Sequence, residues 1–427
     1  MQPDLVTLDF FRDEALVADP YPVLDRIREA GPVWRDPVHG VVVVTGYDEV
    51  LAVVSDADTF SSCNSTTGPF PGFPVSLEGR DAAEVGALID AHRDELPFSD
   101  QLPSFDPPTH TAHRSLLSRL ITPKRLKENE AFMWRLADRV LDPFLAAGGG
   151  DFIGAVANRF ALLVVADLLG VPEEDHAELA QVLTGDVTVG STTDAVMAHS
   201  PLEYLYRRFS DYIEDRRRQP RADVMTEMAQ ARFPDGSLPE VIDVVRVAAN
   251  LFSAGQETTV RLLSSALKLL AEDHALQARL RATPDLIPNF IEEALRFESP
   301  IKGDFRLSRA PATIGGVEIP AGTTVMVHFG AANRDPRQFE NPDVFDPDRP
   351  NARRQIGFGR GIHSCIGAPL ARAEGRVLLQ RLLERTTSVD IDEDRHGPAD
   401  DRRYTYVPTY ILRGLTDLHV TTEAVAS

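Results

Sequence analysis

The residues best suited to bind a metal lie in the segment GFGRGIHSCIGAPLAR, residues 357–372. Cys365 is one of two cysteines in 427 residues, and four glycines surround it, at positions 357, 359, 361 and 367. A helix-like pattern follows over residues 368–385, but a helix N-terminus favours a thiolate by only about 0.3–1 kcal/mol. Metal coordination deprotonates a thiol outright, and glycines let a large prosthetic group approach the backbone. The loop therefore indicates one sulfur ligand to a metal, for which haem is a candidate cofactor.

A nucleophilic cysteine is the alternative chemistry for this loop. Such a cysteine needs a histidine or asparagine base, and His363 lies only two residues away. Both chemistries remain open from the loop alone. The other thiol, Cys63, matches no motif and is expected to be passive. Two cysteines are too few for a disulfide framework, a usual iron–sulfur cluster or an all-cysteine zinc site, which fits a reducing compartment.

A long helix is expected over residues 238–273, and its middle carries the sequence AGQETT. Gly255 and the two following threonines lower helix propensity by roughly 2 kcal/mol relative to alanine, so we expect a local distortion. Glu257 and Thr258 supply an acid and a hydroxyl, the parts of a proton relay. Ala254 and Gly255 leave room for a small ligand against the backbone. A packing glycine beside an exposed glutamate is the alternative interpretation.

The segment FGRGIHSCIG, residues 358–367, resembles the haem loop of the cytochrome P-450 family, with every family-defining position filled. The resemblance implies haem b as the cofactor and Cys365 as the axial thiolate ligand of its iron. It implies that His363 contacts a haem propionate, and that the cofactor site also includes Phe358, Gly359 and Gly367.

The segment AGQETT resembles the oxygen-binding groove that the same family has on its long central helix. The resemblance implies that Thr258 assists oxygen activation, that Glu257 admits protons from solvent, and that Ala254 and Gly255 lie against the cofactor. Many members of the family have aspartate where this chain has Glu257.

Basic residues elsewhere match further family positions. The segment DPPTHTAHRSLL resembles the helix that lies against the haem, which implies propionate contacts from His110 and Arg114. Arg306 stands where the family has another propionate-binding arginine. His113 carries no such match, and His110 with His113 could form half of a zinc site, although no further ligands follow at fitting spacing.

An architectural ion pair is expected from the sequence IEEALRF. Glu293 and Arg296 are three residues apart and share a helix face. The resemblance implies that both are buried and that Arg349 joins them. We expect this triad to support the fold and to take no part in catalysis.

The remaining pattern is mostly helical. Short helices are expected near residues 20–30 and 47–60, two strands around a turn at 32–46, and helices through 110–273 and 287–297. A small β region with two strand-like runs is expected at 312–330, whereas residues 61–105 look too rich in proline and glycine for regular elements. The fold class is therefore mainly α with minor β. By resemblance it is a cytochrome P-450 fold over one domain, 1–427, with haem between the long central helix and the helix after Cys365.

Charge limits the partners. A net charge of −21 disfavours nucleic acid and anionic membranes, and no apolar run approaches the roughly 18 residues of a membrane span. With no signal-peptide pattern, we expect a soluble cytoplasmic monomer. Residues 349–385 break the acidic pattern with eight arginines against two acids. They form either a docking site for an acidic partner or a solvated helix face with internal ion pairs.

The resemblance implies a monooxygenase that inserts one oxygen atom from O2 into a small apolar substrate, such as a terpenoid, steroid, fatty acid or aromatic compound. Electrons would come from a ferredoxin or flavodoxin with its NAD(P)H-dependent reductase. A peroxide-driven peroxygenase is one alternative, which the pair formed by Glu257 and Thr258 disfavours, and a non-catalytic haem-binding or sensor protein is another.

The substrate pocket is expected to draw on residues 61–105, on the region around 170–200, and on four apolar side chains: Phe70, Phe73, Ile301 and Tyr410. Lys302 could meet a substrate carboxylate. Pairing with Asp304 or simple exposure is the alternative for this lysine.

Overall fold

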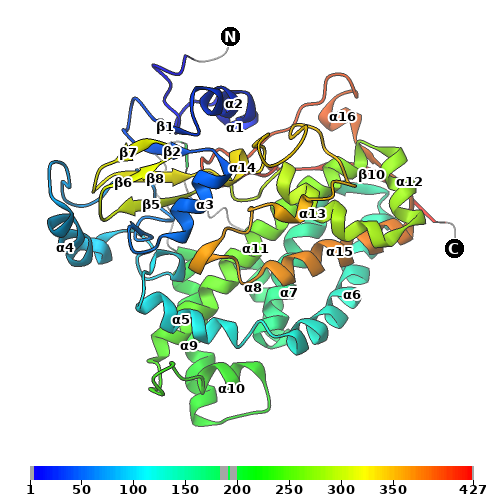
Figure 1. The fold of residues 1–427 in the computed structure, drawn as a ribbon. Coiled ribbons are helices and arrows are strands. Elements are labelled where there is room, and N and C mark those ends of the chain that lie inside the picture. Colours follow the sequence, from blue (N-terminus) through cyan, green and yellow to red (C-terminus); the bar gives the residue numbers. More distant parts are fainter. Residues whose placement is uncertain (1–3, 183–190, 193–199, 426–427) are drawn as a thin grey trace.

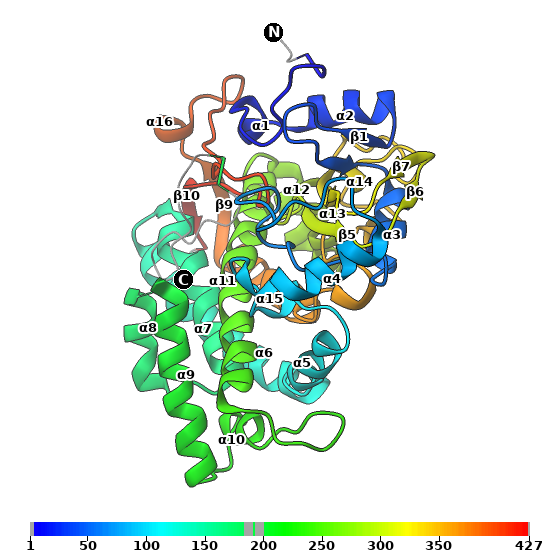
Figure 2. The ribbon, with the colours of Figure 1, turned by 90° about the vertical axis from the view of Figure 1, so that its left-hand side faces the viewer.

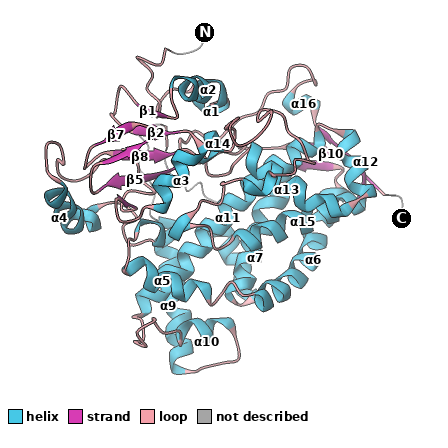
Figure 3. Ribbon diagram, in the orientation of Figure 1, coloured by secondary structure: helices cyan, strands magenta, loops and turns pink. Residues whose placement is uncertain are grey.

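The helices of the computed structural model account for most of its regular structure; the largest sheet lies beside α2, α3 and α4 at one end, and β10 lies at the other end, near α12 (Figures 1 and 3). The structure describes residues 4–182, 191–192 and 200–425. Its α-helices are α1 Ala15–Ala18, α2 Tyr21–Ala30, α3 Tyr47–Ser55, α4 Ala82–His92, α5 Thr109–Ser118, α6 Pro123–Ala146, α7 Asn158–Leu169, α8 His176–Val182, α9 Ser200–Arg218, α10 Val224–Ala229, α11 Val241–Ala271, α12 His274–Ala282, α13 Ile287–Phe297, α14 Phe329–Ala332, α15 Ala368–Arg385 and α16 Glu393–His396. The predicted class, mainly α with minor β, is confirmed.

The central helix, α11, runs through the helical part and contacts α5, α7, α9, α13 and α15 (Figure 2). Its first turn is closed by the Asp243 carboxylate, which accepts a hydrogen bond from the Glu240 N–H at 3.2 Å. Apolar side chains from these helices form one large buried cluster around α11. The predicted long helix is thus confirmed. Within the described residues, no helix combines the length and apolarity that a membrane crossing requires.

The strands form three small sheets. The largest has the order β1-β2-β8-β5-β3, in which only β2 and β8 are parallel. The others have the order β4-β10-β9 and the pair β6-β7. The strand bounds are β1 Val33–Arg35, β2 Val42–Val44, β3 Phe60–Ser61, β4 Gly149–Asp151, β5 Asp304–Ser308, β6 Ala312–Ile314, β7 Val317–Ile319, β8 Thr324–Val327, β9 Thr386–Ile391 and β10 His419–Ala424.

The predicted hairpin near residue 40 is confirmed as β1-β2, whereas the segment 312–330 differs from expectation. Two strands were expected here, but the chain turns twice and forms three. The first two, β6 and β7, pair with each other, and the third, β8, lies between β2 and β5 in the largest sheet. This sheet carries Arg306 on β5, and it packs beside the segment that contains Cys365, through α3.

One helix was missed in the sequence. Residues 61–105 contain α4, so the prediction of an irregular segment is wrong for 82–92. Asp81 accepts a hydrogen bond from the Glu84 N–H at 2.9 Å, and the Glu84 carboxylate accepts one from the Asp81 N–H at 3.2 Å. This reciprocal cap starts the helix, and Val85 and Ile89 are buried on its inner face. Flanking prolines and glycines hid the signal.

The predicted triad on α13 is confirmed. Glu293 and Arg296 are both 0% exposed and form two hydrogen bonds of 2.7 Å. Arg349 donates from Nε to Glu293 Oε1 at 3.0 Å. Both guanidinium groups also donate to backbone carbonyls of the 333–344 segment. The triad therefore ties α13 to the long loop that precedes the Cys365 segment.

Replacement of Glu293 by alanine is expected to lower the free energy of unfolding by about 3–5 kcal/mol, because two arginines are left buried without a carboxylate. Urea unfolding measures the loss. The matched control is Glu128→Ala, which removes an exposed carboxylate whose contact with Lys124 is 3.9 Å long, and it should change stability by less than about 1 kcal/mol. Equal effects of the two substitutions would contradict an architectural role for the triad.

Candidate active site

The loop that holds Cys365 is fixed by its backbone. The Cys365 N–H donates to Phe358 O at 2.7 Å, which closes the loop over the intervening residues. Gly361 has a positive φ of 72°, and a Cβ there would lie 2.2 Å from Val54 O on α3. Only glycine fits this close approach. Because α15 begins at Ala368, the sulfur lies three residues before a helix, as the sequence predicts.

Burial raises the pKa of the Cys365 thiol, although the N–H groups of Gly367 and Ala368 and the charges of Arg114 and Arg372 oppose that shift. The side chain nevertheless keeps accessible surface, because it opens into a cavity. The sulfur is thus reachable by a bound group. A metal ion supplies the positive charge that the thiolate lacks in this site.

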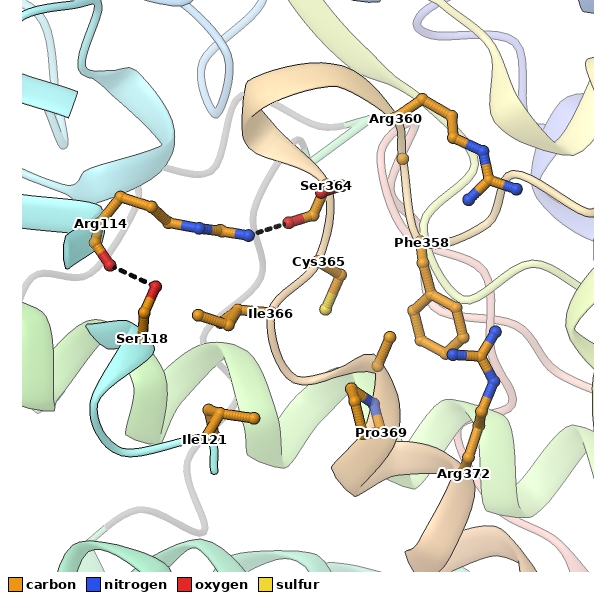
Figure 4. A pocket seen from close by; sticks show the side chains of 12 residues that line it. Arg114, Ser118, Ile121, Phe358, Arg360, Ser364, Cys365, Ile366, Pro369 and Arg372 are labelled. Carbon is orange, nitrogen blue, oxygen red and sulfur yellow. Dashed lines mark hydrogen bonds between the residues drawn. The ribbon is translucent and has the colours of Figure 1, made fainter. Parts of the chain in front are cut away.

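The cavity beside the sulfur has a volume of about 560 Å³. In Figure 4, Cys365 points between Arg114 and Ile366 on one side and Phe358 on the other. Arg114 of α5 donates to Ser364 O at 2.5 Å, and the Arg372 guanidinium lies 4.7 Å from the centre of the Phe358 ring. These contacts join α5 and α15 to the two ends of the loop. Gly359 and Gly367 shape the backbone between them, the first lining the cavity and the second preceding α15.

Four basic side chains predicted to contact carboxylates lie on three elements near Cys365. His110 and Arg114 come from α5, Arg306 from β5 and His363 from the loop itself. The rings of His110 and His363 are 4.2 Å apart between centroids. Burial and the Arg114 charge lower the pKa of His110 to about 4, and burial and the Arg306 charge lower that of His363 to about 2. The structure thus brings the predicted set together.

This arrangement fits a haem. His110 Nε2 is buried and has no hydrogen-bond partner in the described structure. Burial is the main cause of the low pKa of both histidines, and the charges of Arg114 and Arg306 add to it; two propionate carboxylates would balance those charges. Arg306 already pairs with Asp304 at 2.9 Å, so it would divide its donors between that carboxylate and a bound anion. A single sulfur, two arginines and two neutral histidines match a dicarboxylate prosthetic group with one protein thiolate. The residue assignments themselves remain predictions.

The described residues hold no cluster of three or more histidine, cysteine, aspartate or glutamate side chains placed to bind a metal ion. His113, the second histidine of the His-x-x-His pair, instead lies 3.0 Å from Thr109 O and 3.4 Å from an Asp243 carboxylate oxygen. It links α5 to α11, so the structure gives no support to the zinc half-site.

The segment AGQETT lies in an unbroken part of α11, so the expected distortion does not interrupt the helix. The Thr258 hydroxyl donates to Ala254 O at 2.7 Å, and Ala254 is exposed although Leu251 and Phe252 are buried. Glu257 forms a close ion pair with Arg261 one turn along. A Cβ on Gly255 would lie 2.9 Å from Val165 of α7, which is a packing reason for this glycine. Its place in a cofactor site stays a prediction.

Glu374 of α15 is a candidate residue that the sequence reasoning missed. It is 0% exposed, and its Oε2 accepts a hydrogen bond from the Thr259 hydroxyl of α11 at 3.2 Å. Its Oε1 has no partner in the described structure, and burial raises its pKa well above the ordinary value. The available signal was its position: it lies four residues from Leu370 and Leu378, on the apolar face of the helix.

The eight arginines of residues 349–385 fall into two groups. Five of its arginines form ion pairs within the protein, at positions 349, 372, 376, 381 and 385. Arg353, Arg354 and Arg360 are exposed, and Ile362 between them and Cys365 is 39% exposed. The ion-pair interpretation is therefore right for the helix α15, whereas the segment before it presents a smaller basic surface.

Lys302 neither pairs with Asp304 nor is exposed, so both of these predictions are wrong. Lys302 is buried, and its Nζ donates to Thr409 O at 2.6 Å, whereas Asp304 pairs with Arg306. Burial and the nearby Arg413 charge lower the pKa of Lys302 to about 7. The lysine faces a small cavity behind the N-terminal segment, between Phe10 and Thr409.

The four apolar side chains proposed for substrate lining lie outside the cavity at Cys365. Phe70 and Tyr410 pack in an aromatic group with Phe11, and Ile301 packs against the same apolar cluster. Phe73 packs with the cluster around Cys63, which is buried and has a pKa raised by burial to about 11. The cysteine is thus unreactive, as expected. Part of the region 170–200 lies outside the described residues.

Three comparisons place the chain among known proteins. The family model described as cytochrome P-450 matches residues 284–403. Cytochrome P-450 144 of Mycobacterium tuberculosis is 36% identical over 390 residues, which cover 89% of this chain and 86% of that protein. The monooxygenase PikC of Streptomyces venezuelae is 31% identical over 94% of this chain and 91% of its own. The substrate-free structure of CYP150A6 from Mycobacterium marinum superposes with a TM-score of 0.93 at 55% identity, covering 99% of this chain and all of the other.

Glu374 gives a pH prediction. Because the pKa of Glu374 is raised in the folded state, the folded protein keeps a proton that the unfolded chain releases above about pH 4.3. The free energy of unfolding therefore falls as the pH rises from that value toward the raised pKa of the folded state. Glu374→Gln removes this linkage, so the free energy of unfolding of the variant relative to the wild type should rise by up to about 1.4 kcal/mol per pH unit.

Urea unfolding from about pH 5 to pH 8 measures both proteins. The matched control is Glu384→Gln, which changes an exposed carboxylate on the same helix. A constant difference between wild type and Glu374→Gln over this range would show that Glu374 is ionised in the fold.

Proposed function

The chain belongs to the cytochrome P-450 family of monooxygenases, and from this premise we propose that it uses haem b to insert one oxygen atom from O2 into a small apolar substrate. We further propose that its 427 residues form one catalytic domain, that it acts as a soluble cytoplasmic monomer, and that a ferredoxin or flavodoxin with an NAD(P)H-dependent reductase supplies its electrons. The observation that carries the proposal is the Cys365 sulfur, which opens into a cavity and faces two backbone N–H groups, near two arginines and two neutral histidines.

In this proposal, each residue of the site holds one part of the reaction in place. Haem supplies reductive activation of oxygen when it is bound. The Cys365 sulfur is its protein ligand, and the N–H groups of Gly367 and Ala368 hold negative charge on that sulfur. His110, Arg114, Arg306 and His363 supply the donors for two carboxylates. Phe358 covers the cavity, held by the Arg372 guanidinium.

Proton delivery is proposed to use the acid and the hydroxyl on α11. The Glu257 carboxylate pairs with Arg261, and it would take up a proton only when that contact opens. The Thr258 hydroxyl must likewise turn from Ala254 O to donate elsewhere. The exposed Ala254 leaves space on this face of the helix. Each proton delivery therefore requires the Glu257–Arg261 contact and the Thr258–Ala254 hydrogen bond to open, which limits the entry of protons from solvent.

The proposed electron donor is an acidic protein. The exposed basic surface formed by Arg353, Arg354 and Arg360 lies beside Ile362 and the loop of Cys365, on a chain whose net charge is −21. An acidic donor would be steered to this surface and repelled elsewhere. The apolar Ile362 gives such a contact a dry centre.

An apolar substrate is supported by what the structure does with Lys302. Its ammonium group bonds to Thr409 O rather than facing the cavity at Cys365, so no anchor for a substrate carboxylate comes from this lysine. Among the similar structures, CYP109E1 of Bacillus megaterium at 26% identity and a TM-score of 0.78 is a complex with corticosterone. A terpenoid, steroid, fatty acid or aromatic compound remains the proposed class, and a spectral-shift screen of such compounds would narrow it.

Reconstitution tests the proposed function. The purified haem protein should oxygenate a compound from that screen when a ferredoxin, its reductase and NAD(P)H are present, and should not do so with hydrogen peroxide alone. Product formation with peroxide at an equal rate would favour a peroxygenase. A haem protein that binds none of the compounds and forms no product under either condition would favour a sensor.

The partner surface has its own test in the same assay. Arg354→Glu should slow reduction by ferredoxin roughly 3- to 10-fold at low ionic strength, and the difference should shrink as salt is added. Arg80→Glu makes the same charge change beside α4, at an exposed ion pair with Glu84, and should leave the rate unchanged. Equal rates for both variants would contradict docking at this surface.

A further inference from the structure

Asp106 is a buried carboxylate that no step above has used. It is 7% exposed and lies three residues before α5. Its Oδ2 accepts hydrogen bonds from the Ser61 hydroxyl at 2.5 Å, from Arg93 Nη1 at 3.0 Å and from Arg309 Nη2 at 3.1 Å. Its Oδ1 accepts the Ser62 N–H at 2.8 Å. One carboxylate therefore fixes four groups that come from separate parts of the chain.

The bonds to Ser61 and Ser62 fix the end of β3. Ser61 and Ser62 are both buried, so neither can exchange its bond to Asp106 for one to water. The Ser61 hydroxyl also accepts the Cys63 N–H at 3.2 Å. The backbone of this turn thus has a carboxylate and a hydroxyl as internal partners, and the direction of the Ser62 side chain follows from it.

Ser62 connects this turn to the loop of Cys365. Its hydroxyl lies 3.0 Å from His363 Nε2, within hydrogen-bond distance. The imidazole of His363 in turn lies 4.2 Å from that of His110 between ring centroids. His110 belongs to the same segment as Asp106, since its N–H donates to Asp106 O at 2.9 Å. Asp106 is therefore connected to both histidines that are proposed to bind carboxylates, to His110 directly and to His363 through Ser62.

We infer that Asp106 is a positioning residue for the haem site, which holds Ser62 so that its hydroxyl orients His363 beside His110. The inference rests on the proposed haem site. A group that orients a cofactor-binding side chain typically affects affinity about 10- to 100-fold, although it never touches the cofactor. The two arginines that neutralise Asp106 allow a full negative charge to remain buried there.

The negative charge of Asp106 gives a second readout, which distinguishes a positioning role in the haem site from a purely structural role. The Asp106 carboxylate is a buried negative charge bonded to the serine that contacts His363, and it lies in the same segment as His110. Loss of its charge leaves the local potential more positive, and a more positive surrounding favours the reduced state of a bound metal. A substitution that only loosened the turn would not produce a shift of fixed sign.

The test compares four variants as holoproteins, by the rate of haem transfer to excess apomyoglobin and by the reduction potential of the iron. Ser62→Ala removes only the hydroxyl that faces His363, and should speed haem loss roughly 2- to 10-fold. Ser62→Thr restores a hydroxyl and should return the rate to that of the wild type. Asp106→Asn should speed haem loss about 10-fold or more and shift the potential to a more positive value.

The matched control is Asp90→Asn. It breaks the other ion pair of Arg309, of 2.9 Å, and leaves the bonds between Asp106 and both serines in place. Its haem-transfer rate and potential should equal those of the wild type. If Asp106→Asn does not fold, the pair Ser62→Ala and Ser62→Thr decides the question alone.

Two outcomes overturn the inference: a wild-type rate of haem loss in Ser62→Ala, or an equal change in Asp106→Asn and Asp90→Asn. Neither measurement requires a substrate or a redox partner. The inference can therefore fail while the proposed monooxygenase activity holds, and the reverse is equally possible.

Discussion

Burial raises the pKa of the Cys365 thiol, even though two N–H groups and two arginines oppose the rise. A thiol of this kind becomes a thiolate when a metal ion binds it. The surrounding contacts hold the loop in place: Gly361 packs against α3, Arg114 donates to Ser364 O, and α15 packs on α11 and α13. The position of the sulfur is therefore set by the fold itself.

The same reasoning applies to the basic side chains. Imidazoles with pKa values of about 4 and about 2 are neutral at physiological pH, so His110 and His363 act as hydrogen-bonding groups while Arg114 and Arg306 carry charge. A dicarboxylate group would satisfy all four at once. The thiol and these side chains would therefore bind the same cofactor. Asp106 connects their positions, because its backbone carbonyl accepts the His110 N–H and its carboxylate holds the turn that contacts His363.

Local patterns predicted most of this site, since they depend on residues that are close in sequence. The loop of Cys365, the helix α11 and the pairing of Glu293 with Arg296 each follow from spacings of a few residues. Tertiary contacts were less accessible. Lys302 finds its partner 107 residues away, at Thr409. The cap of α4 is a local signal, but the prolines and glycines that flank it obscured the helix.

Glu374 and Asp106 show the limit most clearly. An acid on an apolar helix face is visible in the sequence, but the rise in the pKa of Glu374 comes from burial in the packed structure, which the sequence does not give. The partners of Asp106 come from the end of β3 and the residue after it, the segment after α4 and the residue after β5, and no spacing along the chain predicts that they meet.

The central claim is that Cys365 is the thiolate ligand of a haem iron, and the absorption spectrum of the reduced protein with carbon monoxide tests it most directly. The account predicts the red-shifted Soret band of a thiolate-ligated haem for the wild type, and the loss of that band in Cys365→His with haem still bound. A wild-type band at the position typical of histidine ligation, or a red-shifted band that persists in Cys365→His, would contradict it.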